Sequence, residues 1–300
     1  MIGGLNTAIL GSVGGFEREI EDWRLRVESS NLGGASRNTL DALNEFIITI
    51  KKNSFIHKIK RCNLFCGTNL STALNPIIIG DSNKKVIGNK IDESRGFFEA
   101  DYLERRGLSA NSASVGSQAQ KWLNTGAFIT SVGMDNNNGH LSLMFNNLNA
   151  DEYSMPICGG NYSSSSNLSA FIEFGKDGYL KACSPGSPAL GSTLGQVKLD
   201  NPSKADISGD VWTANRTSST NQKLYKGEDE YDNSEATQDQ SNYTIGGYKF
   251  RIFGAYSGGQ ITQTSNATML FYSLGETLTE TEISILSNAV KLFNTRIGRL

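Results

Sequence analysis

The sequence has 300 residues, of which 38% are hydrophobic and 19% charged, so the chain can bury a sizeable core and is not disordered by composition. Its formal net charge of −2 argues against a nucleic-acid-binding protein, which needs a basic face to neutralise phosphates. No apolar run is long enough to span a bilayer, and the first residues lack the basic and apolar regions of a signal peptide, which favours a cytoplasmic origin.

Residues 1–15 are small, glycine-rich and uncharged, and we predict that they form a flexible arm. An isolated apolar segment has no local surface to cover it, so its apolar side chains are expected to bind another chain. We therefore predict that the arm attaches the protein to its own copies or to other proteins of an assembly. The predicted interface residues are Ile2, Leu5, Ile9, Leu10 and Val13.

Residues 16–58 predict a helical module with two amphipathic helices. Residues 31–34 break the first helix, and Ser36 is the predicted N-cap of the second. Each helix carries one apolar stripe, so the helices should pack on each other and on the domain that follows. The stripes consist of Phe16, Ile20, Trp23 and Val27, and of Leu40, Leu43, Ile47 and Ile50.

From residue 59 onward, the sequence predicts a series of strands separated by polar turns. Strands at this spacing, with no long helix between them, are typical of a two-sheet jelly-roll sandwich, which we place at residues 59–300. In the last internal strand, Tyr248, Phe250 and Ile252 should share one face. The predicted strands include residues 141–146, 171–174, 179–183, 211–217, 223–225 and 248–256.

The end of the chain predicts an apolar strand followed by a helix. The strand covers residues 268–274, and Thr279 with Glu282 three residues later is a capping box that begins the helix. Gly298 ends the helix. One strand feeding one terminal helix would complete the sandwich. The helix should bury a stripe made of Ile283, Leu286, Val290, Phe293 and Ile297.

Two stretches, one around Asn63-Leu64-Phe65-Cys66-Gly67 and one around Phe271-Tyr272-Ser273-Leu274-Gly275, resemble concanavalin A-like (laminin G-like) lectin domains of bacteriophage virion proteins. They frame almost the whole chain, and their shared positions are packing residues rather than catalytic ones. The resemblance implies a mostly β fold, an antiparallel jelly-roll sandwich with an N-terminal helical module and a C-terminal helix. It is carried by Trp23, Gly33-Gly34, Asn63-Leu64-Phe65-Cys66-Gly67, Phe271-Tyr272-Ser273-Leu274-Gly275, Leu278-Thr279 and Asn288-Ala289-Val290.

The resemblance also implies a function. The protein would be a structural protein of a tailed-bacteriophage virion, assembled in the host cytoplasm and displayed on the tail or the head surface. Its lectin-like domain would attach to glycans of the host surface. Its partners would be other virion proteins and its own copies, with no nucleic acid and no membrane insertion. A capsid decoration or cement protein without a ligand is the alternative within the same class.

Two polar loops carry the chemistry that binds sugars in water. Aromatic faces stack on the apolar sides of sugars, and Asn and Asp side chains bond to their hydroxyls. The same composition is found in ordinary solvent-exposed loops, so both interpretations stay open. The candidate glycan-binding residues are Asn161, Tyr162, Tyr231, Asp232 and Asn233.

One acidic motif has the spacing found in glucanases of this fold. Glu230, Asp232 and Glu235 could supply a nucleophile and a general acid of a glycoside hydrolase. The residues between them are polar, whereas a core strand would place apolar residues there. We therefore expect a solvated loop whose carboxyls are exposed with ordinary pKa values, and no enzymatic activity.

No pattern predicts a metal or a cofactor. Cys62, Cys66, Cys158 and Cys183 do not form two zinc-binding pairs and are expected to be buried thiols. Residues 135–139 could offer oxygen atoms to calcium, but Asn138-Gly139 is explained by a tight turn. His57 and His140 have no nucleophile motif near them, and each is expected to have a structural or surface role.

Overall fold

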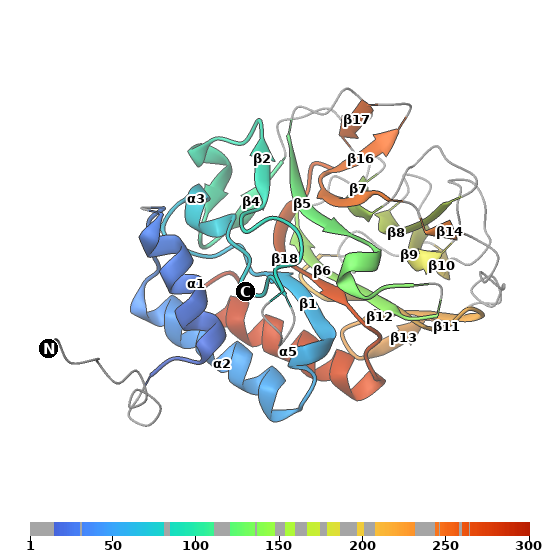
Figure 1. Ribbon diagram of the computed structural model, residues 1–300, viewed down its shortest axis with the longest axis horizontal. Coiled ribbons are helices and arrows are strands. Elements are labelled where there is room, and N and C mark those ends of the chain that lie inside the picture. The colour runs from blue at the N-terminus through green and yellow to red at the C-terminus, as the bar shows by residue number, and fades with distance from the viewer. Residues whose placement is uncertain are drawn as a thin grey trace, which may run out of the picture.

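The computed structural model describes residues 15–30, 32–80, 85–110, 121–135, 137–147, 154–159, 167–174, 179–186, 197–200, 208–231, 244–245, 247–257, 260–263 and 265–300. Two β-sheets pack face to face, and a layer of helices covers the outer side of one of them (Figure 1). The predicted β-sandwich is therefore confirmed. The five predicted interface residues of the arm lie outside the described residues.

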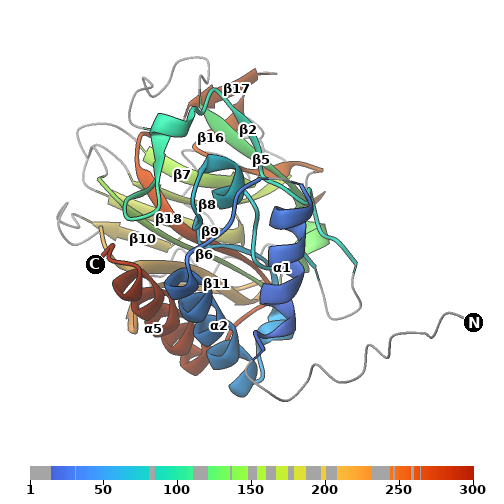
Figure 2. The same ribbon diagram turned by 90° about the vertical axis from the view of Figure 1, so that its left-hand side faces the viewer.

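The helices lie mainly at the two ends of the chain. Helices α2 and α5 run side by side, and α1 crosses beside α2 (Figure 2). The α-helices are α1 (Arg18–Ser29), α2 (Arg37–Lys52), α3 (Leu70–Ala73) and α5 (Glu280–Arg296). The 3-10 helices are η1 (Ile56–Lys58), η2 (Glu99–Asp101) and η3 (Thr130–Val132).

The first sheet has β18 (Thr268–Gly275) near its centre. On one edge β18 pairs with β6 (Gly139–Asn146), and on the other it pairs with β1 (Ile59–Asn63) and then with β4. The order is β13-β12-β11-β6-β18-β4-β3, with β1 beside β18. The remaining strands are β3 (Tyr102–Leu103), β4 (Gly107–Ser109), β11 (Val211–Ser218), β12 (Asn221–Lys226) and β13 (Asp229–Tyr231).

The second sheet has the order β10-β9-β8-β7-β15-β5-β2. A short strand, β14 (Thr244–Ile245), pairs with β8 in parallel, whereas the other pairs among the described residues are antiparallel. The hairpin β16 (Gly254–Ser257) and β17 (Gln260–Gln263) is separate. The main strands are β2 (Glu93–Arg95), β5 (Trp122–Phe128), β7 (Ser154–Gly159), β8 (Asn167–Phe174), β9 (Tyr179–Gly186), β10 (Val197–Asp200) and β15 (Lys249–Ile252).

The first sheet is buried on both faces. Leu141, Leu143 and Phe145 of β6 point into the core between the sheets, as their alternation predicts. Met144 lies on the opposite face, where it joins the hydrophobic cluster of the helices. The helices therefore form a third layer, and strands of this sheet bury the side chains on both of their faces.

The predicted helix starts and apolar stripes are confirmed. The side chain of Ser36 accepts a hydrogen bond from the backbone of Thr39, and Thr279 and Glu282 form the reciprocal capping box. The predicted boundary at residues 58 and 59 falls between η1 and β1, and α1 and α2 share one hydrophobic cluster with β1, β18 and α5. Among the described residues, no helix is long and apolar enough to cross a membrane.

Candidate functional site

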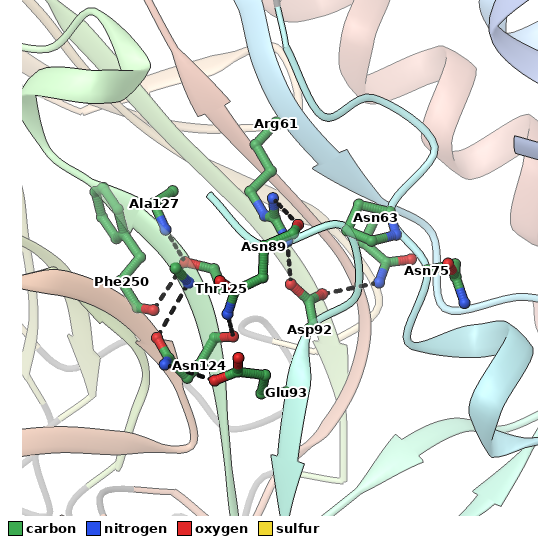
Figure 3. Close-up of polar contacts among 12 residues, drawn as sticks. Arg61, Asn63, Asn75, Asn89, Asp92, Glu93, Asn124, Thr125, Ala127 and Phe250 are labelled. Carbon is green, nitrogen blue, oxygen red and sulfur yellow. Dashed lines mark hydrogen bonds and ion pairs between the residues drawn. The ribbon is translucent and has the colours of Figure 1, made fainter. Parts of the chain in front are cut away.

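A fully buried ion pair lies between the two sheets (Figure 3). Arg61 of β1 donates from Nη2 to Oδ1 of Asp92 at 2.6 Å, and both side chains are completely inaccessible. The Tyr272 hydroxyl accepts from Nε of Arg61 and donates to Asp92, and the Asn63 amide donates to the other carboxylate oxygen. Burial raises the pKa of Tyr272 well above its usual value, so the phenol keeps its proton. The network connects β1 and β18 of the first sheet with the segment that precedes β2 of the second, and its ion pair has no access to solvent.

The same polar contacts continue to the outer face of the second sheet. The backbone of Asn89, which accepts from Arg61, donates to Thr125 at 2.8 Å. The neighbouring Asn124 donates from its side chain to Glu93 at 3.0 Å (Figure 3). Strand register places Glu93, Asn124 and Arg251 beside one another on β2, β5 and β15. The buried network thus supports the strands that carry an accessible row of polar residues.

An aromatic cluster surrounds Arg251 on this outer face. The carbon of its guanidinium lies 5.9 Å from the ring centroid of Trp122 and 5.5 Å from that of Tyr256. Tyr248 stacks beside Tyr256, with centroids 5.7 Å apart and ring planes inclined by 32°. The three aromatic residues and Arg251 are all half-buried, so their side chains are held by packing and still reach solvent. We call Trp122, Tyr248, Arg251 and Tyr256 the aromatic–arginine surface.

An interruption between two strands brings Tyr256 to this surface. The sequence predicts one continuous strand over residues 248–256, and this prediction is wrong because the strand stops at Phe253. Phe253 has a φ of 64°, a left-handed conformation that ends β15 and begins β16 with the alternation shifted by one. Phe250 and Ile252 point into the core as expected, and Tyr256 faces outward beside Arg251. The prediction that Tyr248 shares the face of Phe250 and Ile252 is wrong, because β15 begins only at Lys249 and the Tyr248 ring stacks on that of Tyr256.

The guanidinium of Arg251 has few partners in the protein. Its Nη1 donates to the Lys249 carbonyl at 3.5 Å, and its buried Nε has no hydrogen-bond partner. No carboxylate within the described part of the chain forms an ion pair with it. Burial lowers the pKa of Arg251, since desolvation disfavours the charged form. A half-desolvated cation between aromatic rings is suited to a planar anion, which it can bind with two parallel hydrogen bonds.

The residues predicted to bind glycan are placed elsewhere or fall outside the described residues. Tyr231 belongs to β13 of the first sheet, where its ring centroid lies 6.1 Å from that of Trp212 and packs against the core. The structure therefore does not bring Tyr231 to the aromatic–arginine surface. Asn161, Tyr162, Asp232 and Asn233 lie outside the described residues.

The members of the aromatic–arginine surface were not predicted from the sequence. Trp122 and Arg251 alternate with core residues on their strands, so their outward direction could have been found from strand parity. Tyr256 could not, because the continuous alternation of residues 248–256 would place it inside. Its position depends on the backbone of Phe253, which no sequence pattern indicates.

Glu230 is the one member of the acidic motif that the structure describes. It lies exposed on β13, where Lys223 donates to it at 2.8 Å and the Tyr225 hydroxyl at 3.1 Å. The hydrogen bond from Lys223 holds the pKa of Glu230 below its usual value, so the expectation of an ordinary pKa is wrong. A general acid requires a raised pKa, so this carboxyl is poorly suited to that role. Asp232 and Glu235 lie outside the described residues.

The described cysteines are buried thiols, as predicted. Burial raises the pKa of Cys62 strongly, and it raises the pKa of Cys66 and of Cys158 to about 12, so these thiols stay protonated. The side chain of Cys183 is outside the described residues.

The turn predicted at Asn138-Gly139 lies slightly earlier in the chain. Asp135 and Asn138 exchange backbone hydrogen bonds across it, at 2.8 and 3.5 Å. The Asn138 side chain accepts from the backbone of Thr277 and donates to Gly133. Both polar atoms of the Asn138 amide are therefore hydrogen-bonded within the protein.

His140 is a buried structural residue. Its Nδ1 lies 2.6 Å from the Glu276 carbonyl and its Nε2 lies 2.9 Å from the Ser273 hydroxyl. Burial lowers the pKa of His140 to about 4, so the folded protein holds a neutral imidazole. His57 is exposed. The predicted structural or surface roles of the two histidines are therefore confirmed.

This burial of His140 predicts destabilisation by acid. The unfolded chain protonates this histidine near pH 6.5, whereas the folded protein does so only near pH 4. The contribution of the neutral His140 to the free energy of unfolding is therefore fully present above pH 6.5. It is lost as the pH falls towards 4, which lowers the stability by on the order of 3 kcal/mol. Urea unfolding from pH 7 to 4.5 should show a weaker pH dependence for His140→Gln than for the exposed control His57→Gln. Equal slopes for both variants would contradict a buried neutral His140.

The chain is similar to solved structures at low sequence identity. No family model and no curated protein matches it. The CBM40 domain of the Ruminococcus gnavus IT-sialidase aligns with a TM-score of 0.43 and 9% identity, covering 58% of this chain and 95% of that one. A mutant of Trypanosoma rangeli sialidase displaying trans-sialidase activity aligns with a TM-score of 0.47 and 14% identity, covering 86% of this chain and 40% of that one. The botulinum neurotoxin serotype D binding domain aligns with a TM-score of 0.38 and 10% identity, covering 57% of this chain and 40% of that one.

Proposed function

We propose that this protein is a glycan-binding β-sandwich that takes an acidic sugar on the aromatic–arginine surface. The observation that carries the proposal is Arg251, a half-buried guanidinium that lies beside Trp122 and Tyr256 and has no carboxylate partner among the described residues. A sugar carboxylate would supply the missing anion, and the rings would contact the apolar face of the sugar. The exposed Glu93, which accepts a hydrogen bond from Asn124, offers carboxylate oxygens to sugar hydroxyls.

The proposed role is binding without hydrolysis. Glu230 is held ionised by Lys223, and its strand belongs to the sheet opposite Arg251. Glycoside hydrolysis needs a protonated carboxyl and a second carboxylate beside the same bond. The lowered pKa of Glu230 and its place away from the aromatic–arginine surface therefore support a binding protein over a glycosidase.

A glycan array followed by calorimetry tests this proposal. Arg251→Ala should weaken binding of carboxylated glycans by about 10- to 100-fold, because a charge-assisted hydrogen-bond pair contributes about 1.5–3 kcal/mol. Trp122→Ala should weaken binding of the same ligands. Arg251→Lys should retain only part of the affinity that Arg251→Ala loses. Arg37→Ala is the matched control, since Arg37 lies 4.7 Å from the Phe16 ring on the helical side of the molecule.

Two results would overturn the proposal. Carboxylated and neutral glycans binding equally well would remove the role of Arg251, and unchanged binding by both Arg251→Ala and Trp122→Ala would place the site elsewhere. Reducing-sugar release that disappears in Glu230→Gln would show a glycosidase instead.

The setting we propose for this binding domain is the surface of a tailed-bacteriophage virion. The sequence resemblance at both ends of the chain supports this setting, and the glycan would then belong to the host surface. Mass spectrometry of purified particles tests it directly. A protein that is present in particles yet binds no glycan on the array would be a decoration protein.

A further inference from the structure

A pocket of about 410 Å³ lies between α1, η1 and the segment that follows α3. Arg18, Asp22 and Arg26 line it from α1, since positions four apart share one face of a helix. The volume lies within the range of small-molecule pockets, roughly 300–1,000 Å³. Much of the remaining lining is aliphatic, and we call this part the aliphatic wall. It consists of Ile56, Ile77, Ile78, Ile79 and Val86.

Cationic side chains outnumber carboxylates in this pocket. Two carboxylates line it among the described residues, and both have cationic partners. Asp22 lies 3.5 Å from Arg18, and Glu19 lies 2.6 Å from Lys51, which is outside the pocket. The pocket therefore has an excess of positive charge. Its cationic lining residues are Arg18, Arg26, Lys85 and Lys90.

Arg26 is a half-buried charge of this pocket. Its Nη2 donates to the Pro76 carbonyl at 2.6 Å, whereas its Nε is inaccessible and has no hydrogen-bond partner. No carboxylate forms an ion pair with Arg26 in the part of the chain that the structure describes. Burial lowers the pKa of Arg26 to about 10, so the guanidinium is destabilised but still charged at pH 7. A bound anion would compensate this charge.

We propose that this pocket binds an amphiphilic anion, namely an aliphatic carboxylate whose head lies at Arg26 and whose chain contacts the aliphatic wall. A guanidinium has five N–H donors in a plane that matches a carboxylate, so donors remain beside the bond to Pro76. An aliphatic chain fits better than a sugar, because sugars stack on aromatic rings and no Phe, Tyr or Trp among the described residues lines the pocket.

The proposal goes beyond glycan binding and does not depend on it. No residue of the aromatic–arginine surface lines this pocket. The two sites also combine their groups differently. The guanidinium of Arg251 lies between aromatic rings, whereas Arg26 lies beside aliphatic side chains. We therefore expect the two sites to bind different ligands.

Isothermal titration calorimetry with sodium octanoate at pH 7 tests the proposal. Octanoate should bind the full chain. Octanol keeps the aliphatic chain without the charge, and acetate keeps the charge without the chain, so each should bind about tenfold more weakly or less. Octanol binding as tightly as octanoate would remove the role of Arg26. Acetate binding as tightly would show an adventitious ion only, and no binding of octanoate would overturn the proposal.

The Arg26→Met variant tests the position of the head group. It keeps an unbranched stem and removes the charge, so it should weaken octanoate binding about tenfold or more. Arg24→Met is the matched control and should leave binding unchanged. Arg24 lies on the same helix but outside the pocket, and it pairs with Glu21 and Glu28.

The Val86→Glu variant tests the position of the chain. Val86 is 44% exposed, so the substitution adds a negative charge to the aliphatic wall without disturbing the core. It should also weaken octanoate binding about tenfold or more. Leu292→Glu is its matched control, because Leu292 is also 44% exposed but lies on α5 outside the pocket.

Thermal melts establish which of these variants are folded. Unchanged octanoate affinity in a folded Arg26→Met or Val86→Glu protein would overturn the proposal. If Arg26→Met does not fold, Val86→Glu decides the outcome alone, because its side chain lies partly in solvent.

Discussion

Replacing Asp92 with alanine should lower the free energy of unfolding by about 3–5 kcal/mol. The substitution leaves the charge of Arg61 buried without its carboxylate, while the Tyr272 hydroxyl and the Asn63 amide lose an acceptor. Desolvation of an unpaired charge dominates this cost, because Arg61 and Asp92 are completely inaccessible to solvent. Urea unfolding at pH 7, monitored by circular dichroism, measures the change.

The matched control is Asp41→Ala in the exposed pair Arg37–Asp41. This pair has a similar separation of 3.0 Å, but its side chains are 72% and 48% exposed, so its loss should change stability by under about 1 kcal/mol. Similar losses for Asp92→Ala and Asp41→Ala would mean that the Arg61 network is hydrated rather than buried.

Phe293→Ala should cost about 3–5 kcal/mol of stability as well, through a cavity in the helical layer. Phe293 is 1% exposed in the cluster that α5 shares with α2 and the first sheet. Thr279→Ala, which removes the N-cap of the same helix, should cost only about 1 kcal/mol. Thermal unfolding of the two variants should therefore give clearly different melting temperatures.

Leu292→Ala is the control for Phe293→Ala within one helix. Its side chain is largely outside the cluster, so the substitution should have little effect on the melting temperature. Equal and negligible shifts for Phe293→Ala and Thr279→Ala would show that α5 does not pack on the sandwich.

The helix ends and the core positions were predictable because their causes are local. Ser36 and Thr279 cap their helices through residues three positions away, and the stripes follow the period of the helix. The third layer was harder to predict, since a polar residue such as Ser142 in β6 is typical of an exposed face. That face is covered by helices from both ends of the chain, and a bond to Thr213 satisfies the Ser142 hydroxyl.

The candidate site was not predictable for a related reason. Trp122 and Arg251 are more than 120 positions apart in sequence, and only the pairing of β5 with β15 brings them together. Arg61 illustrates the same limit in the core, because an arginine in a strand normally indicates solvent. Its burial depends on Asp92 and Tyr272, and the latter lies 211 positions away.

The central position of β18 has a consequence for how the chain folds. β1 precedes this partner by about 210 residues, so at about 5–20 residues per second a ribosome completes β18 roughly ten to forty seconds later. During that interval the apolar faces of α1, α2 and β6 stay uncovered. Closing so large a loop costs entropy before any contact compensates for it. The sandwich therefore forms late, and newly made chains expose these apolar faces until β18 has been synthesised.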